Sequence, residues 1–292
     1  GHAAEILDGL PDGGETFDWV DSVSIELTTR MLATLFDFPF EDRRKLTYWS
    51  DISIGSPEKT GADQGPPAEE VQAGLQDLAN TFMGLWAERA AADPTGRNDL
   101  ITMLAHGEDT RDMITRPLEF LGNIMLLIVG GNDTTRNSIS GGLLAFRDHP
   151  AEWAKLQADH SLVPNMVSEI VRWQTPVIHM RRSLKTDYEI QGKTLRAGDK
   201  IVMWYVSGNR DAEVFDNPDA LVIDRPNARR HVSFGFGIHR CMGNRLAEMQ
   251  LRIIWEEILK RFSGIEVTGP ERRLKSNFIR GIRELPVRVH RH

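Results

Sequence analysis

Apolar residues recur at helical spacing through most of the chain and predict a mainly α protein. The helices are expected over residues 16–35, 41–50, 68–91, 100–106, 117–146, 150–159, 163–175 and 241–262. Residues 124–129 form an almost continuous apolar run, which is too short to cross a bilayer. We therefore expect the helix over 117–146 to lie in the protein core.

The pattern changes toward that of strands in two stretches and predicts small β-sheets. A hairpin is expected over 188–195, with its turn near Gln191 and Gly192, and an extended segment over 201–206. Short strands are also expected between 267 and 290. The turn-forming residues 55–67 predict a mobile loop between two helices. No linker divides the chain, so we expect a single domain over 1–292.

Composition excludes several classes of protein. The chain has 292 residues, of which 40% are apolar, and this is ample for a buried core. A net charge of -7 argues against a nucleic-acid partner, because such proteins usually carry a basic balance. No run of about 18 uncharged apolar residues is present, so no membrane span is expected. A single cysteine is typical of a reducing compartment and favours a cytoplasmic location.

That single cysteine, Cys241, lies in a loop rich in glycine and aromatic residues, just before the last predicted helix. A lone thiol cannot form an internal disulfide or a multi-cysteine zinc site, so it must act as a single ligand, a nucleophile or a redox group. A helix N-terminus stabilises an anion, and we therefore expect a lowered thiol pKa and a thiolate. An inert buried cysteine in a glycine-rich turn is the alternative.

The loop from Phe234 to Gly243 resembles the haem-binding loop of the cytochrome P-450 monooxygenases. The pattern is Phe-x-x-Gly-x-His-x-Cys-x-Gly, followed by a long helix. The resemblance implies haem b (iron protoporphyrin IX), with Cys241 as the iron ligand and His239 at a haem propionate. It implies that Phe234, Gly235, Gly237 and Gly243 shape the loop around the cofactor.

A second motif, Gly130-Gly-Asn-Asp-Thr-Thr135, interrupts the apolar helix. Two glycines inside a helix cost about 1 kcal/mol each against alanine. Bare backbone at Gly130 and Gly131 would let a cofactor face approach, and Thr134 can donate a hydrogen bond to the Gly130 carbonyl and bend the helix. The string resembles the oxygen-binding motif of the same family, which implies a proton relay through Asp133 and Thr134. A helix kink without a catalytic role is the alternative.

Four further charged residues match the family by position. Glu169 and Arg172 stand at i and i+3, where a solvated surface pair is the ordinary interpretation. The resemblance instead implies a buried structural clamp of Glu169 and Arg172 joined by Arg225. It also implies that Arg182 binds a haem propionate, although the neighbouring Arg181 competes for this assignment.

Several longer strings look very like the bacterial alkane and fatty-acid terminal hydroxylases. They lie at 24–38, 127–137, 204–211 and 255–262. This class implies O2, a ferredoxin, an NAD(P)H-dependent ferredoxin reductase and terminal hydroxylation of an apolar substrate. The predicted pocket wall is apolar, although each member could be plain core: Leu126, Val129, Gly130, Ile178, Phe278 and Ile279.

Basic residues cluster near the cysteine loop and its helix in an otherwise acidic chain, which suggests a docking face for an acidic redox partner. They are Arg229, Arg230, Arg240, Arg245, Arg252, Lys260 and Arg261. A solvated helix face accounts for about half of them equally well.

The chain is shorter than full family members, and we expect the N-terminal part of the fold to be missing. Three alternatives therefore stay open: an active monooxygenase, a haem-binding fragment without catalytic competence, and a helical interaction domain without haem.

Overall fold

The computed structural model describes residues 1–11, 14–54 and 66–292. Residues 55–65, which make up most of the predicted mobile loop, lie outside the described part. The α-helices are α1 (His2–Asp8), α2 (Glu26–Phe36), α3 (Arg44–Ile54), α4 (Ala68–Ala91), α5 (Leu100–His106), α6 (Pro117–Asp148), α7 (Pro150–Ala158), α8 (Val163–Gln174), α9 (Tyr205–Gly208) and α10 (Asn244–Arg261). The short 3-10 helices are η2 (Phe40–Asp42), η4 (Met113–Thr115), η5 (His160–Leu162), η6 (Ala228–Arg230) and η7 (Gly237–His239).

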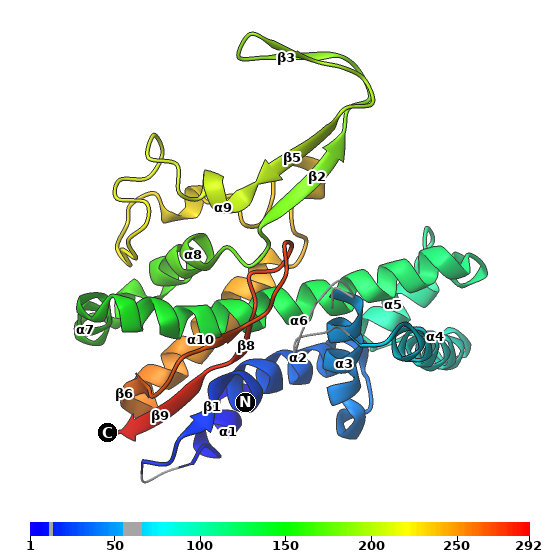
Figure 1. The fold of residues 1–292 in the computed structure, drawn as a ribbon. Coiled ribbons are helices and arrows are strands. Elements are labelled where there is room, and N and C mark those ends of the chain that lie inside the picture. Colours follow the sequence, from blue (N-terminus) through cyan, green and yellow to red (C-terminus); the bar gives the residue numbers. More distant parts are fainter. Residues whose placement is uncertain (12–13, 55–65) are drawn as a thin grey trace.

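The strands form small antiparallel sheets, as the sequence predicts. Strands β1 (Phe17–Asp18), β9 (Pro286–Arg291) and β6 (Phe262–Val267) pair in that order. Strand β2 (His179–Ser183) pairs with β5 (Lys200–Trp204), β3 (Tyr188–Ile190) with β4 (Lys193–Leu195), and β7 (Arg272–Arg273) with β8 (Ile282–Glu284). The β2–β5 ribbon and the β3–β4 hairpin project away from the helices (Figure 1).

Two predicted elements differ from the structure, and one observed helix was not predicted. The helix expected over 16–35 is divided into β1, a π-helical segment η1 (Val20–Ile25) and α2, because Phe17 and Asp18 pair with β9. The strand expected over 201–206 ends at Trp204, where α9 begins. Helix α1 was not predicted; its buried Ala3, Ile6 and Leu7 join the core.

Helix α6 passes through both hydrophobic clusters of the protein and is its central element (Figure 1). Its first half contributes Phe120, Ile124 and Ile128 to the cluster shared with α3 and α4. Its last turns contribute Ile139, Leu143 and Phe146 among others to the cluster shared with α8 and α10. Between them, residues 132–138 are mostly polar and buried. Because buried polar groups need hydrogen-bond partners, these residues require polar groups on the elements that pack against them.

Candidate haem-thiolate site

The cysteine loop is closed by its own backbone. The Cys241 amide donates to the Phe234 carbonyl over 2.8 Å, and the Gly235 amide donates to the Val232 carbonyl over 2.8 Å. Gly235 and Gly237 have φ values of +69° and +71°, which disfavour any side chain. Gly243 has a φ of -88°, so its conformation does not require glycine. Helix α10 begins three residues after Cys241, which confirms a position near a helix N-terminus.

The thiol pKa does not follow the prediction. The pKa of the Cys241 thiol is raised, because surrounding protein atoms desolvate it although the residue as a whole is exposed. A hydrogen bond from the Gly243 backbone and the charge of Arg240 lower the pKa but do not outweigh desolvation. The expectation that the helix N-terminus alone makes a thiolate is therefore wrong for the protein chain by itself. A metal ion would deprotonate the thiol on coordination.

The surroundings of the thiol fit a large flat apolar cofactor. Phe236, Ile238 and Met242 of the loop are 85%, 96% and 86% exposed, an unusual density of apolar surface beside one sulfur. Among the described residues, no group of three or more His, Cys, Asp or Glu side chains could hold a metal ion. Cys241 would therefore suit a metal that arrives already bound in a cofactor and needs one sulfur ligand from the protein. The residues present are consistent with haem b.

The two predicted propionate ligands have no carboxylate partner among the described residues. Arg182 lies on β2, is half-buried, and donates to the carbonyl of Arg181 over 2.9 Å. His239 ends η7 and is exposed. Arg181 is exposed on the same strand, so burial favours Arg182 over it. Cationic or neutral donors in these positions suit a carboxylate ligand; the propionate roles remain predictions.

The glycine motif on α6 is helical throughout. The Thr134 hydroxyl donates to the Gly130 carbonyl over 2.8 Å, as predicted, yet α6 continues without interruption from Pro117 to Asp148. A Cβ atom at Gly130 would meet nothing within 4 Å, so this face is open. At Gly131, a Cβ atom would lie 2.7 Å from Leu32 of α2. Gly131 therefore allows α6 and α2 to pack closely; its contact with the cofactor stays a prediction.

Asp133 points toward α3. It is fully buried, accepts a hydrogen bond from Ser50 of α3, and forms an ion pair with Arg136 one turn further along α6. Arg136 also donates to Asp51 over 2.6 Å. Burial raises the pKa of the Asp133 carboxyl, and the Arg136 charge and the Ser50 hydroxyl oppose this only in part.

The predicted acid and alcohol therefore do not face one another. Successive residues on a helix point about 100° apart, and Asp133 bonds toward α3 whereas Thr134 bonds back along α6. Sequence reasoning missed Ser50 and Arg136, which hold Asp133 in this arrangement. The available signal was that Arg136 follows Asp133 by three residues on the predicted helix, whereas nothing in the sequence singled out Ser50.

The predicted clamp is formed and buried. Arg172 donates to both Glu169 oxygens over 2.7 Å, and Arg225 donates to the same oxygens over 3.0 Å and 3.1 Å. Arg172 also donates to the carbonyls of Asn209, Pro218 and Ala220. The surface-pair alternative is thus excluded, and α8 is tied to the loop-rich segment that leads to the cysteine loop.

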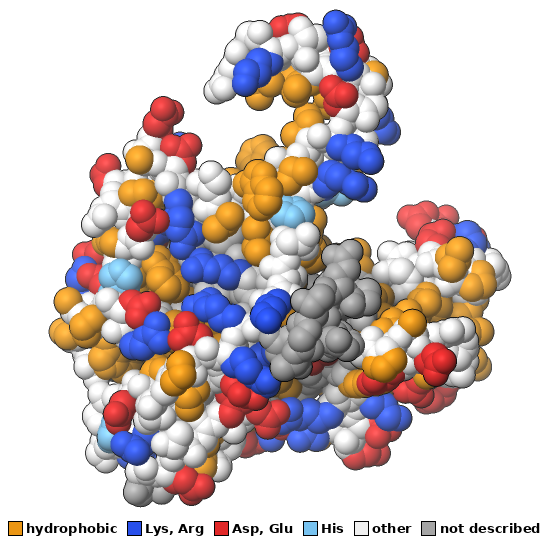
Figure 2. Space-filling model, in the orientation of Figure 1, with side chains coloured by type: hydrophobic (Ala, Val, Ile, Leu, Met, Phe, Trp, Pro, Cys, Tyr) orange, Lys and Arg blue, Asp and Glu red, His pale blue; other side chains and the backbone are white. Residues whose placement is uncertain are grey.

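The predicted pocket wall is only partly open. Leu126 is 69% exposed, while Val129, Ile178 and Phe278 are half-buried. Ile279 is 1% exposed, because it pairs with Val177 in a β-bridge, and the structure does not present it to open space. Hydrophobic side chains also gather along the β2–β5 ribbon (Figure 2), where Val202 and Trp204 are exposed.

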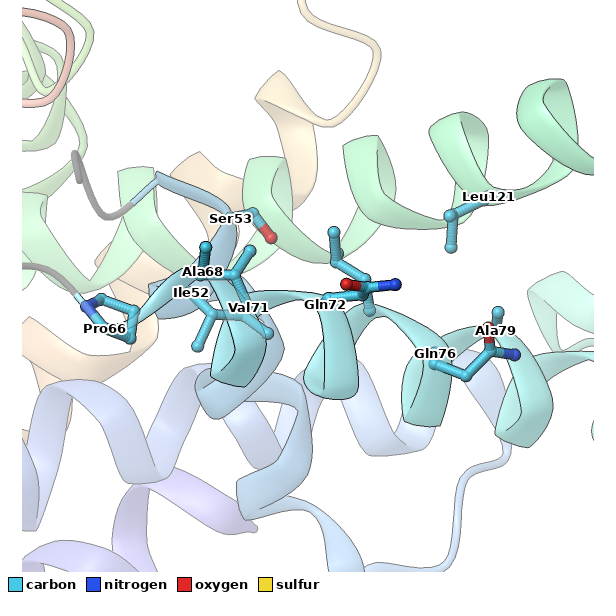
Figure 3. Close-up of a pocket in the computed structure, with 10 residues that line it drawn as sticks. Ile52, Ser53, Pro66, Ala68, Val71, Gln72, Gln76, Ala79 and Leu121 are labelled. Carbon is cyan, nitrogen blue, oxygen red and sulfur yellow. The ribbon is translucent and has the colours of Figure 1, made fainter.

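A separate apolar hollow of about 550 Å³ lies between α3, α4 and the start of α6 (Figure 3). Its lining residues are Ile52, Ser53, Pro66, Ala68, Val71, Gln72, Leu75, Gln76, Ala79 and Leu121. None of the predicted wall residues borders it. The two helices that flank residues 55–65 therefore present apolar side chains to a common space.

Comparisons with known proteins agree with this geometry. The cytochrome P450 family model matches residues 67–287. Linalool 8-monooxygenase of Pseudomonas putida is 36% identical over 290 residues, which cover 98% of this chain and 68% of that protein. The methyl-branched lipid omega-hydroxylase of Mycobacterium bovis is 32% identical over 274 residues, covering 92% of this chain and 62% of that enzyme.

Solved structures give the same picture. Cytochrome P450-153 from Novosphingobium aromaticivorans superposes with a TM-score of 0.88 at 47% identity, covering 99% of this chain and 69% of that one. CYP153D17 from Sphingomonas sp. PAMC 26605 gives a TM-score of 0.88 at 47% identity, with 99% and 70% coverage.

The fold and the loop together define a haem-thiolate protein of mainly helical architecture. The chain belongs to the cytochrome P450 family, whose members are haem b monooxygenases. Bacterial members use O2 and redox partners. Among the described residues, no helix combines the length and apolar character that crossing a membrane requires.

Proposed function

We propose that this protein hydroxylates the terminal carbon of medium-chain alkanes or fatty acids. The observation that carries the proposal is the open backbone face at Gly130, bordered along α6 by the apolar Leu126 and Val129. Apolar walls favour a hydrocarbon-like substrate, since they offer it no hydrogen bonds. Two relatives named above act on linalool and on methyl-branched lipids, both rich in hydrocarbon.

The proposed roles of the chain divide between holding the cofactor and moving protons. Cys241 holds the iron, and Arg182 and His239 bind the propionates. When bound, thiolate-ligated haem supplies oxygen activation and oxidation of a C–H bond. Thr134, which lies on the same open face of α6 as Gly130, passes a proton toward the space that the substrate would occupy. Asp133 supplies protons to it once its contacts with Ser50 and Arg136 loosen.

The partner would be a small acidic ferredoxin, reduced by an NAD(P)H-dependent reductase, in the cytoplasm. Three of the clustered basic residues border a hollow of about 210 Å³ between η6, α8 and α10, namely Arg229, Arg245 and Arg252.

The basic residues of this cluster differ in whether a carboxylate neutralises them. Arg252, Lys260 and Arg261 are paired with acidic neighbours, so they contribute less free charge. Arg229, Arg230, Arg240 and Arg245 have no carboxylate partner among the described residues, and they form the docking face we propose.

Two measurements test the proposed function. A carbon-monoxide difference spectrum of the reduced protein should show the strongly red-shifted Soret band of thiolate-ligated haem. Product analysis with an alkane or fatty acid, ferredoxin and reductase should then yield the terminal alcohol. The band without product would favour the alternative of a haem-binding but catalytically incompetent fragment; no bound haem would contradict both.

Thr134→Ala should separate electron use from product formation. We expect the red-shifted band to remain, because Thr134 does not hold the cofactor, while most electrons appear in hydrogen peroxide instead of alcohol. The ratio of alcohol formed to NAD(P)H consumed measures this. Thr135→Ala is the matched control, since Thr135 is buried on another side of α6. Normal coupling in Thr134→Ala would remove the proton role.

Arg245→Glu should slow ferredoxin-driven reduction about tenfold at low ionic strength, and the difference should shrink as salt screens the charges. Stopped-flow reduction of the haem protein at two salt concentrations measures this. Arg111→Glu, the same charge change in the turn after α5, is the control and should have little effect. Equal rates for Arg245→Glu and the unaltered protein would refute the docking face.

A further inference from the structure

Asn209, which directly follows α9, is fully buried, and its side-chain amide forms three hydrogen bonds. Its Nδ2 donates to Thr175 Oγ1 over 2.9 Å and to Ser233 Oγ over 2.7 Å. Its Oδ1 accepts the Val232 amide over 2.7 Å. A buried amide with all of these positions satisfied fixes its neighbours in one arrangement.

The same residue is joined to the buried clamp. The Asn209 carbonyl accepts a hydrogen bond from Arg172 over 2.7 Å. Thr175 donates in turn to the Arg172 carbonyl over 2.6 Å, and Ser233 donates to the Val171 carbonyl over 2.8 Å. Asn209 thus stands between the end of α8 and the segment that precedes the cysteine loop.

The residues that Asn209 binds, Val232 and Ser233, lie at the start of the cysteine loop. The Val232 carbonyl accepts from Gly235 and the Phe234 carbonyl accepts from Cys241, so the backbone from 232 to 241 is one hydrogen-bonded unit. The backbone amide of Asn209 donates to the Tyr205 carbonyl over 2.9 Å. The Tyr205 side chain lies against Gly235, since a Cβ atom added to Gly235 would be 3.2 Å from the Tyr205 hydroxyl. Contacts from Asn209 and from the start of α9 therefore converge on the same turn.

We propose that Asn209 is a positioning residue for the sulfur of Cys241. It transmits the rigid placement of the Glu169–Arg172 pair to the entry of the cysteine loop, and so holds the thiol where it can ligate iron. The inference rests on Cys241 being the haem ligand. Asn209 itself need not contact the cofactor.

The test compares Asn209→Ala with Asn165→Ala. Asn165 lies on α8 and also donates its side-chain amide to loop carbonyls, those of Ile223 and Arg225, but forms no hydrogen bond with residues 232–241. Ser233→Ala is the milder variant, because it removes one bond to Asn209 and one to Val171 with little change in volume. It keeps the proposal testable if Asn209→Ala does not fold.

Two readouts are used, neither of which is catalytic activity. In the haem-free protein, hydrogen exchange of the Val232 and Cys241 amides should accelerate about tenfold or more in Asn209→Ala and less in Ser233→Ala. In the haem-loaded protein, the red-shifted carbon-monoxide band per bound haem should fall to under about half, replaced by the band of haem without thiolate. Asn165→Ala should change neither readout.

Unchanged exchange and an unchanged band in both Asn209→Ala and Ser233→Ala would overturn the proposal. Equal losses in Asn165→Ala would also overturn it, because they would reflect general destabilisation. Failure of the ligand assignment is distinguishable: a Cys241→Ser protein would then retain the red-shifted band, whatever the result for Asn209.

Discussion

Cys241→Ser is expected to abolish the red-shifted carbon-monoxide band completely, while any haem that stays bound absorbs as a species without thiolate. Serine has nearly the same size as cysteine, but its hydroxyl is far less acidic and is a harder ligand. The raised pKa of the Cys241 thiol already opposes formation of the thiolate, and the far less acidic serine hydroxyl would oppose formation of its anion much more.

The measurement is the reduced difference spectrum at equal protein concentration, with haem content determined separately. Met242→Leu is the matched control, because it removes the neighbouring sulfur of the same exposed loop and should leave the band intact. A Cys241→Ser protein with the full band would contradict the assignment of the iron ligand.

Glu169→Ala is expected to lower the free energy of unfolding by about 3–5 kcal/mol, the range for removing one partner of a buried ion pair. The substitution leaves Arg172 and Arg225 buried without their carboxylate, and it also removes the acceptor of the Val222 amide. This loss is a large fraction of the stability of an ordinary domain, so we expect the unfolding midpoint to fall to a clearly lower urea concentration.

Urea unfolding of the haem-free protein, followed by circular dichroism, measures the change. Glu119→Ala is the control: Glu119 pairs with Arg116 at 2.7 Å on the exposed start of α6, where solvent screens the pair, so its loss should change the stability little. Equal and small losses for both substitutions would show that the buried clamp adds no more than a surface pair.

The buried clamp of Glu169, Arg172 and Arg225 was only partly predictable from the local sequence pattern. Spacing alone put Glu169 and Arg172 on one helical face, but it could not distinguish a buried pair from a solvated one. Burial depends on the segment around residues 216–225, which covers α8 with backbone carbonyls and brings in Arg225 from 53 residues beyond Arg172. Only the family resemblance indicated that third member beforehand.

For Gly130 and Gly131 on α6, the sequence did not indicate what each residue would face. Both residues were expected to face a cofactor, yet Gly131 meets Leu32 of α2 while Gly130 stays open. In the same way, Asp133 and Thr134 are adjacent in sequence but bond to different elements. Sequence neighbours on a helix diverge in direction, and the partner that each meets comes from a distant part of the chain.

Most of the helices were predictable from the sequence, because their apolar faces repeat locally, and so was the place of the single thiol in a glycine-rich loop before α10. These features depend on the order of nearby residues. Only the tertiary structure decided which polar residues of α6 are buried, where Asp133 points, and that Asn209 joins α8 to the cysteine loop. Those contacts link residues far apart along the chain, so packing, and not local pattern, selects them.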